Sequence, residues 1–140
     1  ENQKLANENI PLIAEIPAAV RFISGEPLLG ALNVSRWLAP PGARHGVNWV
    51  IAGGESGHHS RPMNPMWAED LRDQCLAAGV PFHFKQWGHW GPASSSDRRA
   101  VASVDVLGRD GKKIRLFGLG KKQSGRTLDG RKWDGVPATA

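Results

Sequence analysis

Three short apolar segments share one pattern, and this pattern constrains the fold more than any other feature of the sequence. Ala19–Ser24, Val47–Ala52 and Val80–Lys85 are rich in β-branched or aromatic side chains, and glycine and polar residues follow each of them. Segments bounded in this way are typical of β-strands. Because their apolar runs are nearly continuous, they suit a parallel sheet that is covered on both faces. The sequence therefore predicts an α/β fold with three neighbouring parallel strands.

A helix is predicted between the second and third strands, over Asn64–Ala78. Asn64 is a favourable N-cap, Pro65 suits the first helical position, and Gly79 suits the position after the last turn. One face of this helix would carry four apolar residues at helical spacing: Trp67, Leu71, Cys75 and Ala78. A strand, a helix and a strand in this order form a right-handed crossover unit.

Two earlier segments are less regular. A short helix is predicted over Pro11–Ile16, where apolar residues gather and where Pro17 would end the helix. Leu28–Pro40 is ambiguous, because its apolar residues would fit either one helical turn or a short strand.

The pattern changes after Trp90. Val101–Leu107 and Lys113–Phe117 alternate loosely between apolar and polar residues, and the turn-forming sequence Arg109–Gly111 lies between them. Alternation on both sides of a short glycine-containing turn predicts a β-hairpin.

The last part of the chain is expected to form an irregular basic tail, with Leu128 and Trp133 as isolated anchors. Residues 1–107 contain nine Lys/Arg and ten Asp/Glu, a net charge of −1, whereas residues 108–140 contain nine Lys/Arg and three Asp, a net charge of +6. A basic segment can contact phosphate groups or simply keep a protein in solution. If this one binds nucleic acid, the candidate contacts are Lys112, Lys113, Lys121, Lys122 and Arg126.

Three strands are too few to close a barrel, which needs about eight. We therefore expect either a partial (β/α) barrel or a small parallel sheet with flanking helices, followed by a C-terminal β-hairpin and the irregular basic tail. On this division residues 1–92 are the C-terminal part of an α/β barrel, and residues 93–140 are the hairpin and tail. Such a sheet would expose a long apolar strand edge. We expect the chain to be a fragment that lacks preceding strands and self-associates through this edge.

Ligands of parallel α/β folds bind at the C-terminal ends of the strands, and this rule selects the candidate binding residues. They are Ser24, Glu26, Gly53, Gly54, Glu55, Ser56, Lys85, Gln86 and Trp87. Carboxylates, a lysine and an amide could together hold a ligand with both an amino and a carboxyl group. Adjacent glycines allow the backbone to approach a ligand closely, and Trp87 could either stack on a base or cover the core. The sequence assigns no catalytic residue.

The two carboxylates of this set also have structural alternatives. Glu55 could form a salt bridge with Arg61 at a tight turn, and Glu26 could form a buried salt bridge with Arg21 or Lys85. Both alternatives would place the charges at the strand ends without any ligand.

The cysteine and histidine content argues against a metal centre within this sequence. Cys75 is the only cysteine, which excludes an intramolecular disulfide and fits a reducing cytoplasm. An iron–sulfur cluster takes about three or four thiolates, and the histidines show no metal-site spacing. The sequence shows no apolar run of membrane-helix length and no signal peptide. We expect a cytoplasmic protein with no membrane contact.

A set of motifs spread over nearly the whole chain resembles one family. These motifs are Glu1–Gln3, Arg21–Gly30, Trp49–Gly57, Arg61–Met63, Leu71–Cys75, Phe84–Gly88, Gly120–Lys122, Gly125–Arg126 and Leu128–Arg131. In this order they are similar to a family of phage or prophage proteins of unknown function that is grouped with radical-SAM-like barrels. Each motif is weak alone, whereas the set is specific.

The resemblance implies a larger parent protein. Full-length members carry an N-terminal segment with clustered cysteines of the kind that ligates a [4Fe–4S] cluster. This chain would then be the C-terminal portion, the missing N-terminal portion would be its partner, and the chain alone would be inactive. By resemblance, the strand-end residues would face S-adenosylmethionine or a substrate that the sequence does not name. The alternative is a nucleic-acid-binding module that uses the basic tail.

Overall fold

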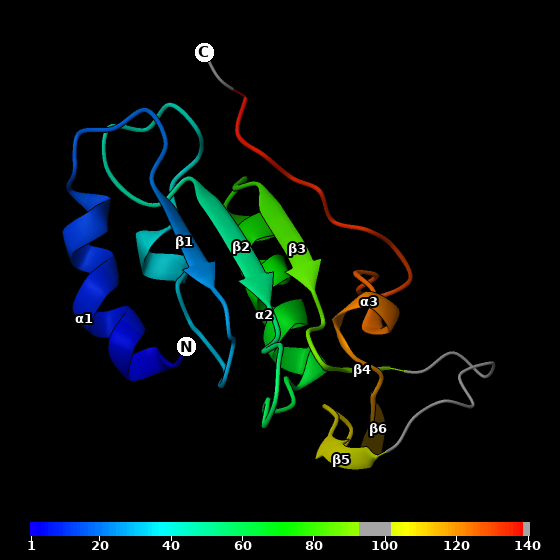
Figure 1. The fold of residues 1–140 in the computed structure, drawn as a ribbon. Coiled ribbons are helices and arrows are strands. Elements are labelled where there is room, and N and C mark those ends of the chain that lie inside the picture. The colour runs from blue at the N-terminus through cyan, green and yellow to red at the C-terminus, as the bar shows by residue number, and fades with distance from the viewer. Residues whose placement is uncertain (93–101, 139–140) are drawn as a thin grey trace.

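The structure, a computed structural model, describes residues 1–92 and 102–138. These residues form one parallel and one antiparallel sheet with three α-helices, in a mixed α/β arrangement (Figure 1). In chain order the elements are α1 (Gln3–Ala14), β1 (Phe22–Gly25), the short 3₁₀ helix η1 (Ser35–Trp37), β2 (Trp49–Gly53), α2 (Pro65–Ala77), β3 (Phe82–Gln86), β4 (Trp90–Gly91), β5 (Ser103–Leu107), β6 (Lys113–Gly118) and α3 (Lys121–Ser124).

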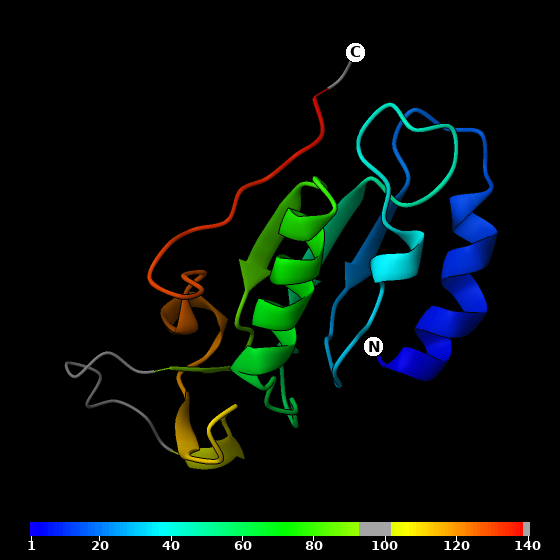
Figure 2. The same ribbon diagram turned by 180° about the vertical axis from the view of Figure 1, so that it is seen from behind.

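The first sheet contains β1, β2 and β3 in that order, and both neighbouring pairs are parallel. Ile23 lies beside Val50, and Ile51 lies beside His83. All three strands predicted from the apolar segments are therefore confirmed, together with their parallel arrangement. Figure 2 shows that α2, which connects β2 to β3, lies across one face of this sheet.

The helix predicted between β2 and β3 is also confirmed. The Asn64 side chain accepts a hydrogen bond of 3.0 Å from the Met66 N–H, and Pro65 occupies the first turn. Gly79 follows the last turn with φ of 65°, in the left-handed region that favours glycine. At 13 residues α2 is far shorter than the ~20 residues of a membrane-spanning helix. Within the described ranges no helix is long and apolar enough to cross a bilayer.

The first helix differs from the prediction, because it spans Gln3–Ala14 rather than Pro11–Ile16. Asn2 starts it early, since its side chain accepts a hydrogen bond of 3.1 Å from the Leu5 N–H. The buried side chains of α1 recur at helical spacing, at Ala6, Ile10 and Ala14. Pro11 lies inside the helix, where its missing N–H removes one backbone hydrogen bond. The proline therefore marks neither the start nor the end of this helix.

The ambiguous segment between β1 and β2 forms the helical turn and, in place of a short strand, a single isolated bridge. η1 is a single helical turn, and Leu38 forms an isolated parallel bridge with Val47. The segment also buries three side chains in the core, those of Leu28, Leu32 and Val34.

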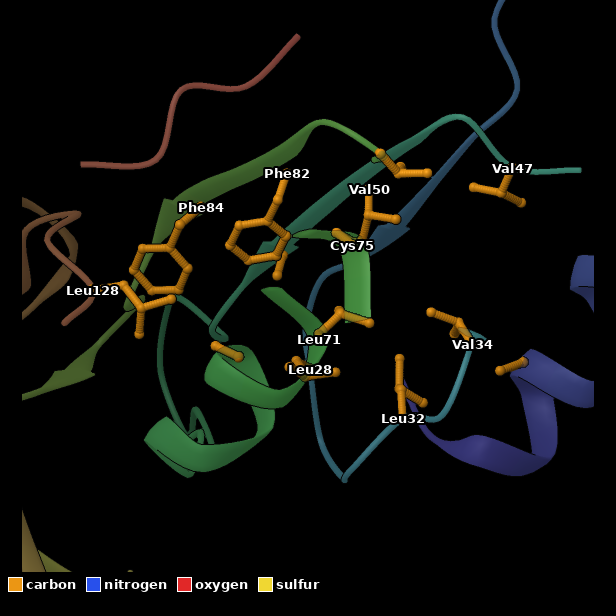
Figure 3. Packing of buried hydrophobic residues seen from close by; sticks show 14 of the residues in the cluster. Leu28, Leu32, Val34, Val47, Val50, Leu71, Cys75, Phe82, Phe84 and Leu128 are labelled. Carbon is orange, nitrogen blue, oxygen red and sulfur yellow. The ribbon is translucent and has the colours of Figure 1, made fainter. Parts of the chain in front are cut away.

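The hydrophobic core lies between the parallel sheet and α2 (Figure 3). Val50 and Phe84 point into it from the sheet, and Leu71 and Cys75 meet them from the helix. All four side chains are fully buried. Burying a side chain of the size of valine, leucine or phenylalanine stabilises a fold by about 1.5–3 kcal/mol relative to leaving it exposed.

The opposite side of the parallel sheet, here called the open face, has no helix over it among the described residues (Figure 1). Side chains alternate along a strand, so this face carries the residues between the core residues. They are Phe22, Ser24, Trp49, Ile51, His83 and Lys85. The rings of Phe22 and Trp49 lie 5.5 Å apart, and Phe22 is 48 % exposed. The sequence pattern predicted cover on both faces, and this part of the chain covers one.

The second sheet contains β4, β6 and β5 in that order. β5 and β6 pair antiparallel, which confirms the predicted hairpin, although Val101 of the predicted first strand lies outside the described residues. The Asn64 amide donates a hydrogen bond of 2.9 Å to the Leu107 carbonyl, and Arg109 forms an ion pair with Asp70 of α2. The hairpin is thereby attached to α2.

The tail is more ordered than predicted, because it pairs with the edge of β3. The Phe84 N–H donates to the Trp133 carbonyl at 2.9 Å, and the Gly135 N–H donates to the Phe82 carbonyl at 3.0 Å. Both predicted anchors hold it in place: Leu128 is fully buried, and the Trp133 ring lies 6.2 Å from that of Phe82. The β3 edge is thus covered, whereas β1 has no strand partner on its outer side in the described sheet.

Candidate functional site

The candidate site lies where the three parallel strands end. Because β1, β2 and β3 run in the same direction, the residues that follow them meet at one edge of the sheet. The Leu28 N–H donates a hydrogen bond of 2.9 Å to the Gly53 carbonyl, and the Gly54 N–H donates one of 3.0 Å to the Gln86 carbonyl. The backbone therefore ties the three strand ends together before any side chain is considered.

Four of the predicted residues form one hydrogen-bonded cluster, here called the tip cluster: Glu26, Ser56, Lys85 and Gln86. Lys85 Nζ donates to Glu26 Oε2 at 2.7 Å, and Gln86 Nε2 donates to Glu26 Oε1 at 2.8 Å. Gln86 Nε2 also lies 3.2 Å from Ser56 Oγ. Gly53 makes room for this arrangement, since a Cβ there would lie 3.3 Å from the Glu26 carboxyl carbon.

The partner of Glu26 is therefore Lys85, one of the two alternatives that the sequence offered. Arg21, the other alternative, donates instead to the carbonyl oxygens of Gly46 and Ala43 at 2.5 Å and of Ala18 at 2.7 Å. Its guanidinium secures the loops at the far end of the sheet and leaves Glu26 to the strand ends.

Glu55 belongs to a separate pair with Arg61. The Glu55 carboxylate accepts from Arg61 Nε at 2.9 Å, from Arg61 Nη2 at 2.6 Å and from the Arg61 backbone N–H at 2.7 Å. These hydrogen bonds hold the pKa of Glu55 at about 2, below its ordinary value of 4.5. The salt bridge expected as the structural alternative is thus formed. None of these hydrogen bonds joins Glu55 to the tip cluster.

Gly54 and Trp87 have structural roles in this arrangement. A Cβ on Gly54 would overlap the carbonyl oxygen of Trp87, so the ends of β2 and β3 approach closely only because Gly54 lacks a side chain. Trp87 is buried, its indole N–H donates to the Thr127 carbonyl at 2.8 Å, and its ring lies 5.0 Å from that of Phe84. The tryptophan covers the core, as in the alternative that the sequence left open.

Ser24 lies nearby, together with His83, which was not among the predicted binding residues. Ser24 is exposed on the open face, which it shares with Lys85 and His83. Burial lowers the pKa of His83, and the positive charges of Arg126 and Lys85 lower it further. His83 Nδ1 is buried, and among the described residues it makes no hydrogen bond. The period of two along a strand was the signal for His83, because it places residues i and i+2 on one face.

The five candidate nucleic-acid contacts do not form one patch. Lys112 pairs with Asp110 at 2.9 Å, Lys113 approaches Asp105 at 3.8 Å, and Arg126 forms an ion pair with Asp134 beside β3. Lys121 and Lys122 lie on α3, beyond the end of β6, and both are exposed. At about 3.3 Å per residue, the length of β6 separates Lys113 from the chain that leads to α3 by ~17 Å.

A metal centre has no support in this part of the chain. Residues 1–92 and 102–138 contain no group of three His, Cys, Asp or Glu side chains arranged to hold a metal ion. Cys75 is fully buried, and burial raises the pKa of its thiol to about 12. The thiolate that a metal requires is therefore disfavoured at this residue.

Comparison with known proteins gives one family and no individual relative. No curated protein and no solved structure matches the chain. The family described as "Protein of unknown function (DUF5131)" matches residues 1–137, almost the whole chain. This protein is therefore a member of the DUF5131 family.

Proposed function

We propose that this chain forms one wall of a pocket for a small ligand that carries an amino and a carboxyl group, in a radical-SAM-like enzyme of phage or prophage origin. The observation that carries the proposal is the position of the Glu26 carboxylate, between Lys85 and Gln86 at the joined strand ends. The motifs that resemble the radical-SAM-like barrels give the class of enzyme and make S-adenosylmethionine the expected ligand.

The tip cluster presents opposite charges side by side. An ammonium group of a ligand can approach the Glu26 carboxylate, and its carboxylate can approach the Lys85 ammonium, each through charge-assisted hydrogen bonds. The Lys85 side chain is 50 % exposed and that of Glu26 is 20 % exposed, so both are within reach of a ligand. Because the Lys85 end of the pair is open to solvent, the ion pair is partly screened, and a ligand can compete for its charges.

The open face provides the surface over which the rest of the ligand would extend. Ser24 and Ile51 lie next to the tip cluster along the strands, and Phe22 and Trp49 lie farther from it. The face therefore offers a polar end beside the charges and an aromatic end beyond them. Apolar surfaces with a few convergent polar groups are typical of small-molecule sites.

The two cofactors of radical-SAM chemistry fit this chain unequally. The amino-acid end of S-adenosylmethionine matches the charges of Glu26 and Lys85. A [4Fe–4S] cluster takes about three or four thiolates, and the single cysteine, Cys75, is buried in the core. In the proposed enzyme the cluster is held by cysteines outside this sequence. S-adenosylmethionine would supply the radical when bound, and the residues of this chain would orient its amino-acid end.

The test is S-adenosylmethionine binding by the product of the full reading frame, expressed and purified without oxygen. Glu26→Gln and Lys85→Met each remove one charge of the tip cluster, and Lys132→Met removes an exposed charge of the tail as the matched control. Hydrogen bonds to charged groups contribute about 1.5–3 kcal/mol. We therefore expect each tip-cluster variant to bind about tenfold or more weakly, and the control to bind like the wild type.

Two results would contradict the proposal. One is equal binding by the wild type and all three variants, with matching thermal unfolding as evidence that the variants fold. The other is a full reading frame that encodes no cysteine cluster, and whose protein shows no iron–sulfur absorbance and does not cleave S-adenosylmethionine.

A further inference from the structure

A pocket lies at the same edge of the sheet and uses none of the tip-cluster residues. It has a volume of about 350 Å³ and is lined by Gly57, His58, His59, Ser60, His89 and Trp90. Its first side is the loop after β2, and its second side is the chain after β3. The volume falls at the lower end of the range of about 300–1,000 Å³ for small-molecule sites.

Two hydrogen bonds hold the sides of this pocket in position. The Trp90 indole N–H donates to the Ser60 carbonyl at 2.7 Å, and the His89 backbone N–H donates to the Glu55 carbonyl at 2.8 Å. His59 adopts φ of 61°, a left-handed conformation that side-chain-bearing residues rarely adopt. Residues held in such conformations are found preferentially at binding and active sites. The pocket is therefore formed before any ligand enters it.

The lining is dominated by flat rings. Three imidazoles and one indole surround the space, and no carboxylate is among the lining residues. Indole and imidazole rings stack on nucleobases, and a single base–aromatic contact contributes about 1–3 kcal/mol. Imidazole N–H groups also donate hydrogen bonds to oxyanions. These groups suit a ligand that combines a planar ring with a phosphate.

Charges around the pocket favour the same ligand. The His89 carbonyl accepts hydrogen bonds of 3.0 Å from both the Leu119 and the Gly120 N–H, and Lys121 follows Gly120 directly at the start of α3. Glu55, beside the pocket, is already neutralised by Arg61. A lysine thus follows directly in sequence after a backbone contact of the pocket, and the neighbouring carboxylate is already paired.

We infer that this pocket binds one nucleotide unit, with the base against its rings and the phosphate near its histidines and Lys121. The inference rests on residues outside the tip cluster, so it can fail while the proposed function holds. Within the described residues the three histidines are not arranged to hold a metal ion, which separates this site from a metal centre.

The experiment compares adenosine 5′-monophosphate, adenosine and inorganic phosphate as probes for the full chain, by equilibrium dialysis with and without EDTA. We expect the monophosphate to bind more tightly than either of its parts. His58→Ala removes an exposed ring from the pocket and should weaken that binding about tenfold. His45→Ala removes an exposed histidine that pairs with Glu15 elsewhere, and should leave binding unchanged.

The same probes distinguish the other outcomes. Equal binding by wild type and His58→Ala overturns the inference, as does binding that EDTA abolishes, because the latter would reveal a metal site. A short oligoadenylate tests whether the pocket also binds a nucleotide that is part of a nucleic-acid strand. If His58→Ala weakens oligoadenylate binding, the result supports the inference. If His58→Ala leaves oligoadenylate binding intact and the monophosphate does not bind, the contact lies outside this pocket and the inference is overturned. Glu26→Gln should not affect any of these measurements.

Discussion

Lys85 Nζ lies 2.7 Å from Glu26 Oε2, so the two outer strands of the parallel sheet meet through their side chains above the end of the middle strand. The middle strand permits this contact because glycines stand at its last position and at the position after it. Gly53 leaves room for the Glu26 carboxylate, and Gly54 leaves room for the backbone of Trp87. The geometry of the tip cluster thus depends on two absent side chains.

Substitution of these glycines should separate the effect of Gly54 on backbone packing from the effect of Gly53 on the position of the Glu26 carboxylate. Gly54→Ala forces a Cβ into the Trp87 carbonyl and should destabilise the fold by about 1–3 kcal/mol, as overpacking does. The three atoms nearest to a Cβ at residue 53 all belong to the movable Glu26 side chain, so Gly53→Ala should alter ligand binding more than stability. Gly30→Ala, whose Cβ would have its nearest neighbour at 3.9 Å, is the control. Urea unfolding of the three variants measures the difference, and a Gly54→Ala protein as stable as Gly30→Ala would refute the packing argument.

Cys75 should be unreactive in the folded protein. Its thiol is fully buried and its pKa is raised to about 12, so almost no thiolate is present at pH 8. A thiol-reactive chromogenic disulfide should therefore label the chain only in denaturant. Leu76→Cys places a second thiol at the next position, which is 55 % exposed in the wild type, and should add one fast reaction. Rapid labelling of the native wild type would contradict the packing of α2.

The Glu55–Arg61 pair should be sensitive to acid. The folded pKa of Glu55 is about 2, below its ordinary 4.5, so the stabilisation is complete above pH 4.5 and is lost as the pH falls toward 2. Arg61→Ala should return the pKa to near 4.5, whereas Arg36→Ala should leave it unchanged. Carboxyl-carbon NMR of Glu55 follows the titration directly. A midpoint near 4.5 in the wild type would show that the pair is not formed in solution.

Loss of the Trp133 anchor should open the β3 edge. Its ring packs on Phe82, and its indole N–H donates to the Leu128 carbonyl at 3.0 Å. Trp133→Ala should lower stability by about 2–3 kcal/mol and increase self-association, because unpaired strand edges recruit other strands. Val136→Ala, at a position 62 % exposed, is the control. Light scattering over a concentration series measures the association, and association equal to that of the wild type would contradict this role of the tail.

The lysines of α3 should dominate any nucleic-acid binding by the tail. Lys121 and Lys122 make no ion pair among the described residues, whereas Lys112 is paired with Asp110. Each lost phosphate contact lowers the slope of log affinity against log salt by about 1. Lys121→Ala and Lys122→Ala should therefore flatten the salt dependence with labelled single-stranded DNA more than Lys112→Ala does. Equal slopes for all three variants would argue against the α3 lysines.

The parallel sheet, α2 and the hairpin could be predicted because each has a local signal. Apolar runs ending in glycine mark the strands, and Asn64 with Gly79 bounds the helix. By contrast, β4 is only two residues long, and the edge pairing of the tail depends on contact with β3, far away in the sequence. Neither has a periodicity to detect. Pro11 misled the reasoning on α1, because one missing hydrogen bond inside a helix is tolerated when capping and burial support the rest.

The candidate site was predictable in position and less so in its pairings. The strand-end rule selected Glu26 and Lys85 correctly as neighbours, because parallel strands end at one edge. The rule could not distinguish Glu55 from the residues of the tip cluster, because Glu55 also follows a strand end but forms its hydrogen bonds with Arg61. Nor did it reach Arg126, since only tertiary structure brings the tail beside His83.

The pairing of residues 133–135 with β3 also affects the order in which the protein can be completed. A ribosome makes β3 well before it makes the residues that pair with the edge of β3. The emerging chain therefore has an unpaired strand edge for part of its synthesis. Growing chains with unpaired edges are prone to premature association. Chaperone attachment should accordingly be strongest on ribosome-bound chains that stop short of Trp133, and it should fall once residues 133–135 have emerged.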